Sequence, residues 1–379
     1  MAATLSAEAD TPVRGIDPVP LDEVPEVAAA MERLGLGRFA ADGGLTGVMG
    51  RNDNWAGRTE SGREVFVKRI GGEGPHARAR FDRLCAFEAA LAGTTPSGWR
   101  APVFLGGDRD ALVLAFERLE GGRAGHHVAE DGEFDAVLAR RAGRAVAEVH
   151  ELAVRRESME ELRGAGLPGH IRALTLQDYA GSSFAELEAW ALIHHDKGLN
   201  RALAALRERS DAASRVPSHC DLRLDQFLLV GEELYLTDWE EFRLADPAHD
   251  VGGLVGEWLF RAASRMFTTA DSADADSVGD AHGSIVRGGE DELTAVRPLI
   301  TAFWQGYREV RPAADHDPGD PGFAERVVAF AGWHLFDRML AGAMFGPKLT
   351  GMERGVAGVG RGALLSPERF VETIGLVEE

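Results

Sequence analysis

The chain has 379 residues, 45% of them hydrophobic, and a formal net charge of −20 at pH 7. This length allows one large domain or two ordinary ones with a substantial core. The acidic balance argues against nonspecific nucleic-acid binding and against an anionic membrane surface. It would suit a cationic substrate, and it is also common in ordinary soluble proteins.

Cysteine usage and the N-terminus bear on the compartment. The two cysteines, Cys85 and Cys220, lie far apart and form neither a disulfide framework nor a zinc-binding spacing. The N-terminus lacks the basic start and apolar stretch of a signal peptide, and no run of 18 apolar residues occurs. We therefore expect a cytoplasmic protein with reduced thiols and no membrane-spanning helix.

The first third of the chain predicts a small, strand-rich lobe. After a flexible tail at 1–20, residues 25–36 have helical spacing. Residues 46–70 predict strands with a polar loop at 50–57, a turn at Ser61 and Gly62, and the strand EVFVKRI. A long helix at about 75–92 and two strands, APVFLGG and ALVLAFERLEGG, complete a lobe that spans 21–120.

Residues 121–379 predict a larger, mainly helical lobe. Helical periodicity covers 133–152, one or two helices in 184–209, 251–267 and most of the C-terminal region. Residues 268–283 have the composition of a mobile loop. Two short apolar strands, FLLV and LYLTDW, interrupt the helices, so the expected fold class is α+β with two lobes.

Those two strands carry an unusual number of charges. The stretch HCDLRLDQFLLVGEELYLTDWEEF (219–242) places Asp221 five residues before Gln226, and Asp238 follows twelve residues later. An aspartate can orient a hydroxyl and accept its proton, while an amide oxygen and a second aspartate can hold Mg²⁺ on phosphates. The spacing therefore indicates a site for phosphoryl transfer.

Other residues complete an ordered set that resembles the protein kinases, which use H-R-D-x-x-x-x-N followed by D-F-G. Lys68 lies in the strand VFVKRI, where a lysine would contact ATP phosphates, and Glu88 on the next helix could pair with it. The segment after LVLAF would be the hinge near the adenine. In place of a G-x-G-x-x-G loop stands GRNDNWAG. The nucleotide contacts expected from these segments come from Asn52, Asn54, Glu117, Arg118 and Leu119.

Three motifs resemble the aminoglycoside phosphotransferase and choline kinase superfamily more closely: HCD, TDWE and DPAHDVGG (246–253). The resemblance covers about residues 40–350 and implies a bilobal, protein-kinase-like fold that uses ATP and Mg²⁺. It implies that Asp221 is the catalytic base, that Gln226 and Asp238 are metal ligands, and that Lys68 contacts phosphate. The superfamily usually has Asn at the position of Gln226, and a Gln amide reaches one methylene further.

Neighbouring polar residues have structural as well as functional interpretations. His219 is expected to hold the loop by hydrogen bonds, and Asp250 to brace its backbone. Arg223 either neutralises the acids or touches the γ-phosphate. Asp225 is a further metal ligand or an Arg-paired, solvated carboxylate, and Glu240 and Glu241 are an exposed strand end or part of an acceptor cleft.

A closer resemblance concerns the acceptor. The combination of GRNDNWAG, VFVKRI, HCDLRLDQFLL and LYLTDWEEFRLADP is similar to the kinase-like subunits of class V lanthipeptide and thioamitide synthetases. It implies phosphorylation of Ser and Thr in a ribosomal precursor peptide, followed by elimination by a separate HopA1-like lyase. Two alternatives stay open: a small-molecule kinase of the aminoglycoside type, and a pseudokinase that binds nucleotide, leader peptide or lyase.

Overall fold

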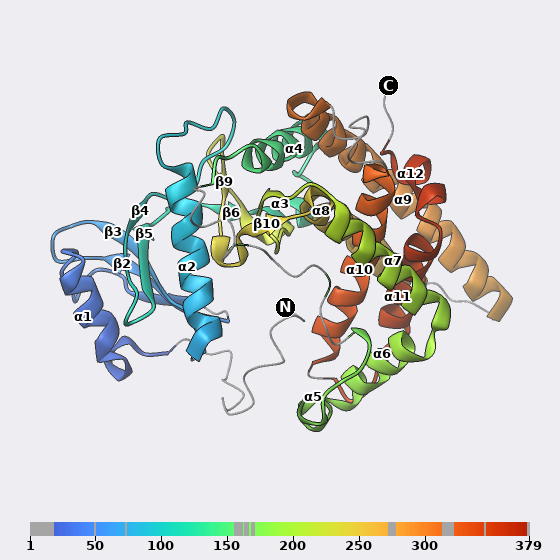
Figure 1. Ribbon diagram of the computed structural model, residues 1–379, viewed down its shortest axis with the longest axis horizontal. Coiled ribbons are helices and arrows are strands. Elements are labelled where there is room, and N and C mark those ends of the chain that lie inside the picture. Colours follow the sequence, from blue (N-terminus) through green and yellow to red (C-terminus); the bar gives the residue numbers. More distant parts are fainter. Residues whose placement is uncertain are drawn as a thin grey trace.

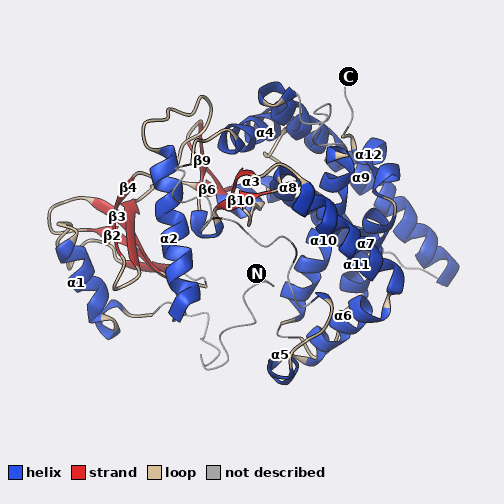
Figure 2. Ribbon diagram, viewed as in Figure 1, coloured by secondary structure: helices blue, strands red, loops and turns tan. Residues whose placement is uncertain are grey.

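A computed structural model describes residues 19–48, 51–72, 74–154, 162, 167, 171–271, 278–312, 322–344 and 346–376. It has a small lobe built on an antiparallel sheet and a large helical lobe, with short strands between them (Figures 1 and 2). The predicted α+β class with two unequal lobes is confirmed.

The small lobe is a five-stranded antiparallel sheet in the order β1-β2-β3-β5-β4. Because side chains alternate along a strand, β5 sends Val113 and Ala115 to one face and Leu114 and Phe116 to the other. Helix α1 (Pro25–Arg33) packs on the first face and α2 (Gly74–Leu91) on the second. The strands are β1 Thr46–Val48, β2 Asp53–Arg58, β3 Glu64–Arg69, β4 Phe104–Asp108 and β5 Val113–Glu117.

The polar segment 50–57 differs from the predicted loop. Residues 53–58 form β2, which pairs with β3 along its whole length and places Asn54 opposite Lys68. The polar side chains and Gly57 of this strand are typical of a loop, although its first five residues are buried. The neighbouring bend packs closely on the end of β3, because a Cβ on Gly71 would lie 2.6 Å from the carbonyl oxygen of Arg51.

Short strands between the lobes position the charged cluster. The two predicted strands, β8 (Phe227–Val230) and β9 (Glu233–Leu236), pair as a hairpin, and β6 (Arg123–Ala124) pairs with β8. Strand β7 (Val216–Ser218) pairs with β10 (Arg243–Ala245). Consequently the segment after β7 and the segment after β9 emerge side by side between the two lobes.

The helical lobe is held together by close helix pairs, of which α4 (Ala136–His150) and α9 (Val278–Val310) are one. A Cβ on Gly143 would overlap the carbonyl oxygen of Phe303, and a Cβ on Gly306 would overlap that of Arg140. Both glycines therefore allow the two backbones to touch. The other helices are α3 Gly125–Glu130, α5 Leu176–Gly181, α6 Phe184–His195, α7 Lys197–Ala212, α8 Pro247–Asp271, α10 Phe323–Ala343, α11 Gly351–Leu365 and α12 Pro367–Ile374.

The predicted loop at 268–283 is wrong in part. Helix α8 continues to Asp271 and α9 begins at Val278; residues 272–277 lie outside the described part of the chain, as does most of the expected tail at 1–20. The small and polar residues at 268–271 and 278–283 are thus compatible with a helix, although their composition is typical of loops.

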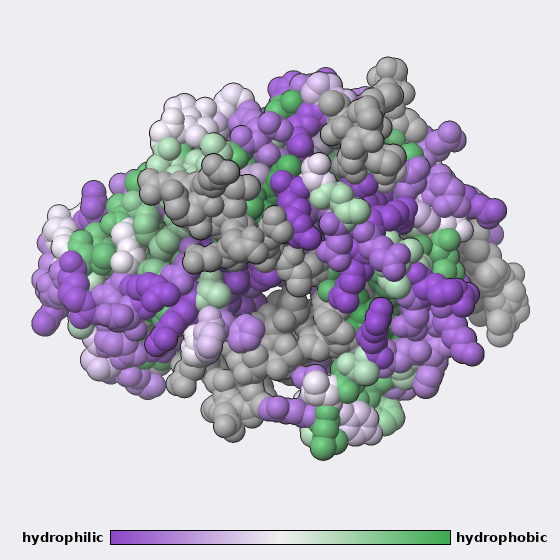
Figure 3. Space-filling view, in the orientation of Figure 1, coloured by the Kyte–Doolittle hydropathy of each residue, from purple (hydrophilic) through white to green (hydrophobic). Residues whose placement is uncertain are grey.

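Hydrophilic side chains dominate the face drawn in Figure 3. Apolar ones gather at the left, over the small lobe, and at the lower edge over α5 and α6, where Leu176 and Phe184 are exposed. Among the described helices, none is long and apolar enough to cross a membrane.

Candidate active site

The loop after β7 carries Asp221, and Asp250 holds its backbone. Cys220 has φ 63°, a left-handed conformation that is uncommon for a residue other than glycine. The Asp250 carboxylate accepts the backbone N–H groups of His219 (2.6 Å) and Cys220 (2.8 Å). These bonds fix the unfavourable conformation immediately before Asp221. The geometry agrees with the expected bracing role of Asp250.

His219 connects this loop to the segment after β9. Its Nε2 lies 2.8 Å from the carbonyl oxygen of Thr237 and is the donor there, while Nδ1 accepts from the backbone N–H of Asp221 at 3.4 Å. Both ring nitrogens are therefore occupied by backbone groups. This arrangement matches the structural interpretation of His219.

Asp221 lies in a partly closed environment beside a cation. Burial raises the pKa of the Asp221 carboxyl, and the Arg223 guanidinium, whose Nε lies 3.9 Å from Oδ1, opposes that shift. A carboxylate with a raised pKa is a stronger general base. Arg223 also pairs with Asp225 at 3.1 Å, so the Arg-paired interpretation of the partly exposed Asp225 agrees with the structure.

Gln226 and Asp238 lie at one end of the β8–β9 hairpin. The backbone oxygen of Gln226 accepts the N–H and hydroxyl of Thr237, at 2.9 and 3.1 Å, which places the two expected ligands on adjoining segments. The Gln226 side chain is buried, with 4% of its surface exposed. Asp238 has φ 67°, a second left-handed residue, and its side chain is 29% exposed.

This donor set suits a hard cation. A carboxylate and an amide oxygen are ligands of the kind that Mg²⁺ takes together with substrate phosphates. A second group of potential ligands, Cys220, His249 and Asp250, is a poorer candidate. Its carboxylate is engaged by backbone N–H groups, and burial raises the pKa of the Cys220 thiol well above its usual value.

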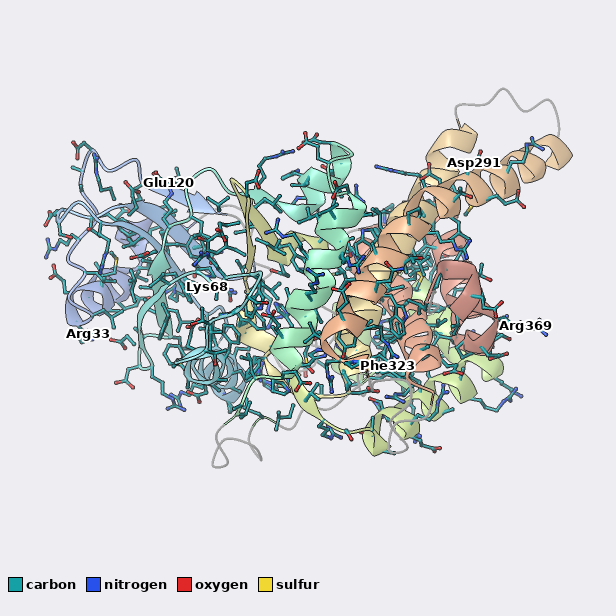
Figure 4. All side chains as sticks on the ribbon, turned by 90° about the horizontal axis from the view of Figure 1, so that it is seen from above. Arg33, Lys68, Glu120, Asp291, Phe323 and Arg369 are labelled. Carbon is teal, nitrogen blue, oxygen red and sulfur yellow. The ribbon has the colours of Figure 1, made fainter. Side chains whose placement is uncertain are left out.

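Lys68 reaches this region from the small lobe. Its ammonium contacts Asp238 and lies 3.0 Å from Oε2 of Glu240. Burial disfavours the charged form, but the two carboxylates outweigh it and raise the pKa of Lys68. Figure 4 shows Lys68 well inside the molecule, in contrast to outer residues such as Arg33 and Arg369. Lys68 is therefore a charged lysine at the junction of the lobes.

The expected pair between Lys68 and Glu88 is wrong. Oε1 of Glu88 is buried and has no hydrogen-bond partner among the described residues, and burial raises the pKa of this carboxyl to about 7. The reason is the rotation of α2 about its own axis, which decides which side chains face the site. Its face toward the segment 239–241 carries Arg80, Arg83 and Phe87 at helical spacing, while Glu88 lies a further 100° around the axis.

Asn52 also has a role that differs from the predicted nucleotide contact. Its amide nitrogen donates to Glu240 at 2.7 Å, and its amide oxygen accepts from the Gly71 N–H and from Arg80. Both ends of the side chain are thus committed to the protein. Asn54, which donates to the backbone oxygen of Asn52, faces Lys68 across the ladder, and its contact with nucleotide stays a prediction.

The hinge begins where β5 ends. The N–H groups of Glu117 and Arg118 are used by the carbonyls of Val103 and Glu64. The N–H of Leu119 forms no backbone hydrogen bond within the described chain. The backbone contacts of Glu117, Arg118 and Leu119 with an adenine stay predictions, and among their N–H groups only that of Leu119 lacks a backbone partner in the described chain.

Glu240 and Glu241 correct another expectation, since neither is an exposed strand end. Glu240 is 5% exposed, and Glu241 forms ion pairs with Arg83 and Arg243. Lys68, Arg80 and Arg51 lower the pKa of the Glu240 carboxyl despite its burial. The sequence offered Glu240 only as a possible part of an acceptor cleft, and it gave no indication of the contact with Lys68 or of a role for Arg80. The one signal was that two glutamates directly follow Asp238.

A buried strand lysine meets Asp238 between two unequal lobes, beside a loop aspartate whose backbone is braced by Asp250. This arrangement is kinase-like. The model of the phosphotransferase enzyme family matches residues 50–292, and the chain belongs to that family. None of the curated proteins compared matches the sequence.

Solved structures with this fold include kinases of small molecules. An ethanolamine kinase of Plasmodium vivax is 11% identical, with a TM-score of 0.50 over 87% of this chain and 84% of its own. A choline/ethanolamine kinase family protein of Mesorhizobium loti is 17% identical (TM-score 0.40, 91% and 99% covered). A choline kinase of Streptococcus pneumoniae is 14% identical (TM-score 0.40, 85% and 99% covered). At such identities the likeness to the Plasmodium vivax enzyme establishes the fold alone.

Proposed function

We propose that this protein is an ATP- and Mg²⁺-dependent kinase that phosphorylates Ser and Thr hydroxyls of a ribosomally made precursor peptide in the cytoplasm. The observation that carries the kinase half is the convergence of Asp221, Asp238 and Lys68, from three separate segments, between the two lobes. The peptide half rests on the motifs shared with class V lanthipeptide synthetases.

Each residue has a defined part in the transfer. Asp221 orients the acceptor hydroxyl and takes its proton as the oxygen bonds to the γ-phosphorus of ATP. Lys68 and Arg223 supply positive charge on the two sides of the transferred group. Asp238 and the Gln226 amide would hold Mg²⁺, which neutralises phosphate charge when bound. ADP leaves with the electron pair of the broken P–O bond.

The product suits a second enzyme that performs β-elimination. A phosphorylated Ser or Thr loses its α-proton and expels phosphate, which is a better leaving group than hydroxide, to give dehydroalanine or dehydrobutyrine. This chain supplies the leaving group, and a separate HopA1-like lyase would supply the base. The lyase is accordingly the partner that we propose alongside the precursor peptide.

The test is a transfer assay with candidate acceptors. A candidate precursor peptide that contains Ser and Thr is incubated with the protein, ATP and Mg²⁺, and its mass is measured. We expect a gain of one phosphoryl group per modified hydroxyl, located on Ser or Thr by fragmentation. Transfer to ethanolamine or an aminoglycoside, with none to the peptide, would instead assign a small-molecule kinase. Nucleotide binding with no acceptor modified in either assay would indicate a pseudokinase.

A further inference from the structure

Glu240 lies at the centre of a buried network that joins three segments of the site. Its carboxylate is 3.0 Å from Nζ of Lys68, 2.8 Å from the guanidinium of Arg80 and 2.7 Å from the amide nitrogen of Asn52. These partners come from β3, from α2 and from the bend before β2. One side chain therefore links the small lobe to the segment that carries Asp238.

The network is nearly closed to water. The side chains of Lys68, Arg80 and Glu240 are 9%, 3% and 6% exposed, whereas that of Asp238 is 29% exposed. A buried carboxylate must keep its partners, because an unpaired buried charge is strongly unfavourable. Asp238, at the solvent side, is the carboxylate that can exchange Lys68 for another cation at lower cost.

The charges balance in a way that suits nucleotide binding. Lys68 and Arg80 are two cations, and Glu240 and Asp238 are two anions. If Asp238 turns to a metal ion, Lys68 and Arg80 share the single carboxylate of Glu240. One positive charge is then uncompensated, and it resides at the solvent-side end, on Lys68, where a phosphate can meet it.

Arg80 and Asn52 fix the geometry of this carboxylate. The Arg80 guanidinium bonds to Glu240, to the Asn52 amide oxygen at 2.6 Å and to the carbonyl of Gly71 at 3.0 Å. Arg83, one turn further along α2, bonds to the backbone oxygen of Glu240 at 2.9 Å. Helix α2 thus contributes cations toward the site, and its own glutamate, Glu88, contributes nothing to Lys68.

We propose that Glu240 is the positioning residue for Lys68: it anchors the ammonium for contact with ATP phosphates, and Arg80 and Asn52 hold Glu240 in place. The lysine's carboxylate partner is thereby supplied by the segment after Asp238 instead of by α2. This inference rests on the nucleotide use in the proposed function and is independent of the acceptor. Nucleotide titration without any acceptor therefore separates its failure from failure of the peptide assignment.

The experiment is a double-mutant cycle on the full chain. The dissociation constant of a non-hydrolysable ATP analogue is measured calorimetrically at saturating Mg²⁺ for wild type, Lys68→Met, Glu240→Gln and the double variant. We expect each single change to weaken binding about 10- to 100-fold, the range for loss of a charge-assisted hydrogen bond. The double variant should bind no more weakly than Lys68→Met, since Glu240 acts through that lysine.

Two further variants sharpen the comparison. Glu88→Gln should leave the dissociation constant within about twofold of wild type. The same is expected of Glu309→Gln, a control on α9 whose carboxylate, like that of Glu240, pairs with two cationic side chains, here Arg140 and Arg144. Thermal unfolding verifies that each variant is folded. Should Glu240→Gln not fold, Asn52→Ala keeps all charges: it should weaken binding a few-fold, and Lys68→Met should abolish that difference.

Three results would overturn the proposal. One is additivity, in which the double variant loses the product of the two single effects. Another is a loss of nucleotide affinity in Glu88→Gln equal to that in Glu240→Gln, which would show that the partner of Lys68 is Glu88 on α2. The last is a Glu240→Gln variant that binds nucleotide normally at saturating Mg²⁺ but needs far more Mg²⁺, which would make Glu240 a metal ligand.

Discussion

Nε2 of His150 lies 3.3 Å from the Asp250 carboxylate in the interior of the helical lobe. The other ring nitrogen meets the Tyr307 hydroxyl at 2.9 Å, and Arg311 donates to that hydroxyl at 3.0 Å. The carboxylate that braces the catalytic loop is thus itself supported from α4 and α9. Stability of the helical lobe and geometry at Asp221 are physically connected through this chain of hydrogen bonds.

The hydrogen bonds around His150 predict that the unfolding free energy depends on pH. Burial lowers the pKa of His150, so the imidazole is neutral when folded. Its contribution to stability is present above the unfolded pKa of about 6.5 and is lost as the pH falls below that value. His150→Gln should therefore flatten the decline of unfolding free energy between pH 7 and pH 5, and cost about 1–3 kcal/mol at pH 7.5. Denaturant titrations at several pH values test this.

The control for that measurement is His127→Gln on α3, whose side chain is 64% exposed. We expect its pH profile to follow that of the wild type. An unchanged slope in His150→Gln would contradict the assignment of a neutral, buried His150.

Glu88 should act on stability with the opposite sign. Burial raises its folded pKa to about 7, so its ionisation destabilises the protein as the pH rises from about 4.5 through 7. Glu88→Gln should raise the unfolding free energy at pH 8 by about 1–3 kcal/mol and have little effect at pH 5. A variant that is less stable than wild type at pH 8 would show that the ionised carboxylate has a partner.

Much of the site could be predicted from the stretch 219–242, because the order of Asp221, Gln226 and Asp238 along a loop and a hairpin constrains where they meet. The predicted pair between Lys68 and Glu88 is wrong for a physical reason. Sequence spacing gives the distance along a helix, but packing of Phe87 on Trp239 sets which face of α2 turns to the site. The contact of Glu240 with Lys68 could not be predicted, since two consecutive glutamates after a strand are usually solvated.

The tight contact between α4 and α9 gives a stability prediction. Gly143→Ala should destabilise the protein by about 2–4 kcal/mol, because the new methyl would overlap the carbonyl oxygen of Phe303 and force the helices apart. Gly358→Ala is the matched control. Its Cβ would meet nothing within 4 Å on the exposed side of α11, so helix propensity should raise stability by about 0.5–1 kcal/mol. The melting temperatures of both variants test this prediction. Equal shifts in melting temperature would contradict the close approach of α4 and α9.

Gln226 offers a direct test of the metal site. Because the site is built around the longer amide, we expect Gln226→Asn to lower turnover and raise the Mg²⁺ concentration needed for half-maximal rate. Gln226→Ala should lower turnover further. The measurement is the Mg²⁺ dependence of the transfer rate for all three proteins. An increase in rate in Gln226→Asn would mean that the glutamine impairs the wild-type site.

In the proposed phosphoryl transfer, Asp221 accepts the proton of the acceptor hydroxyl. The most direct test is the rate of phosphopeptide formation by Asp221→Asn, followed by mass spectrometry beside wild type and the distant surface control Asp211→Asn. We expect Asp221→Asn to lose about 10²–10⁴-fold in turnover, with ATP affinity within a few-fold of wild type and the control fully active. Phosphopeptide formed by Asp221→Asn at the wild-type rate would contradict it.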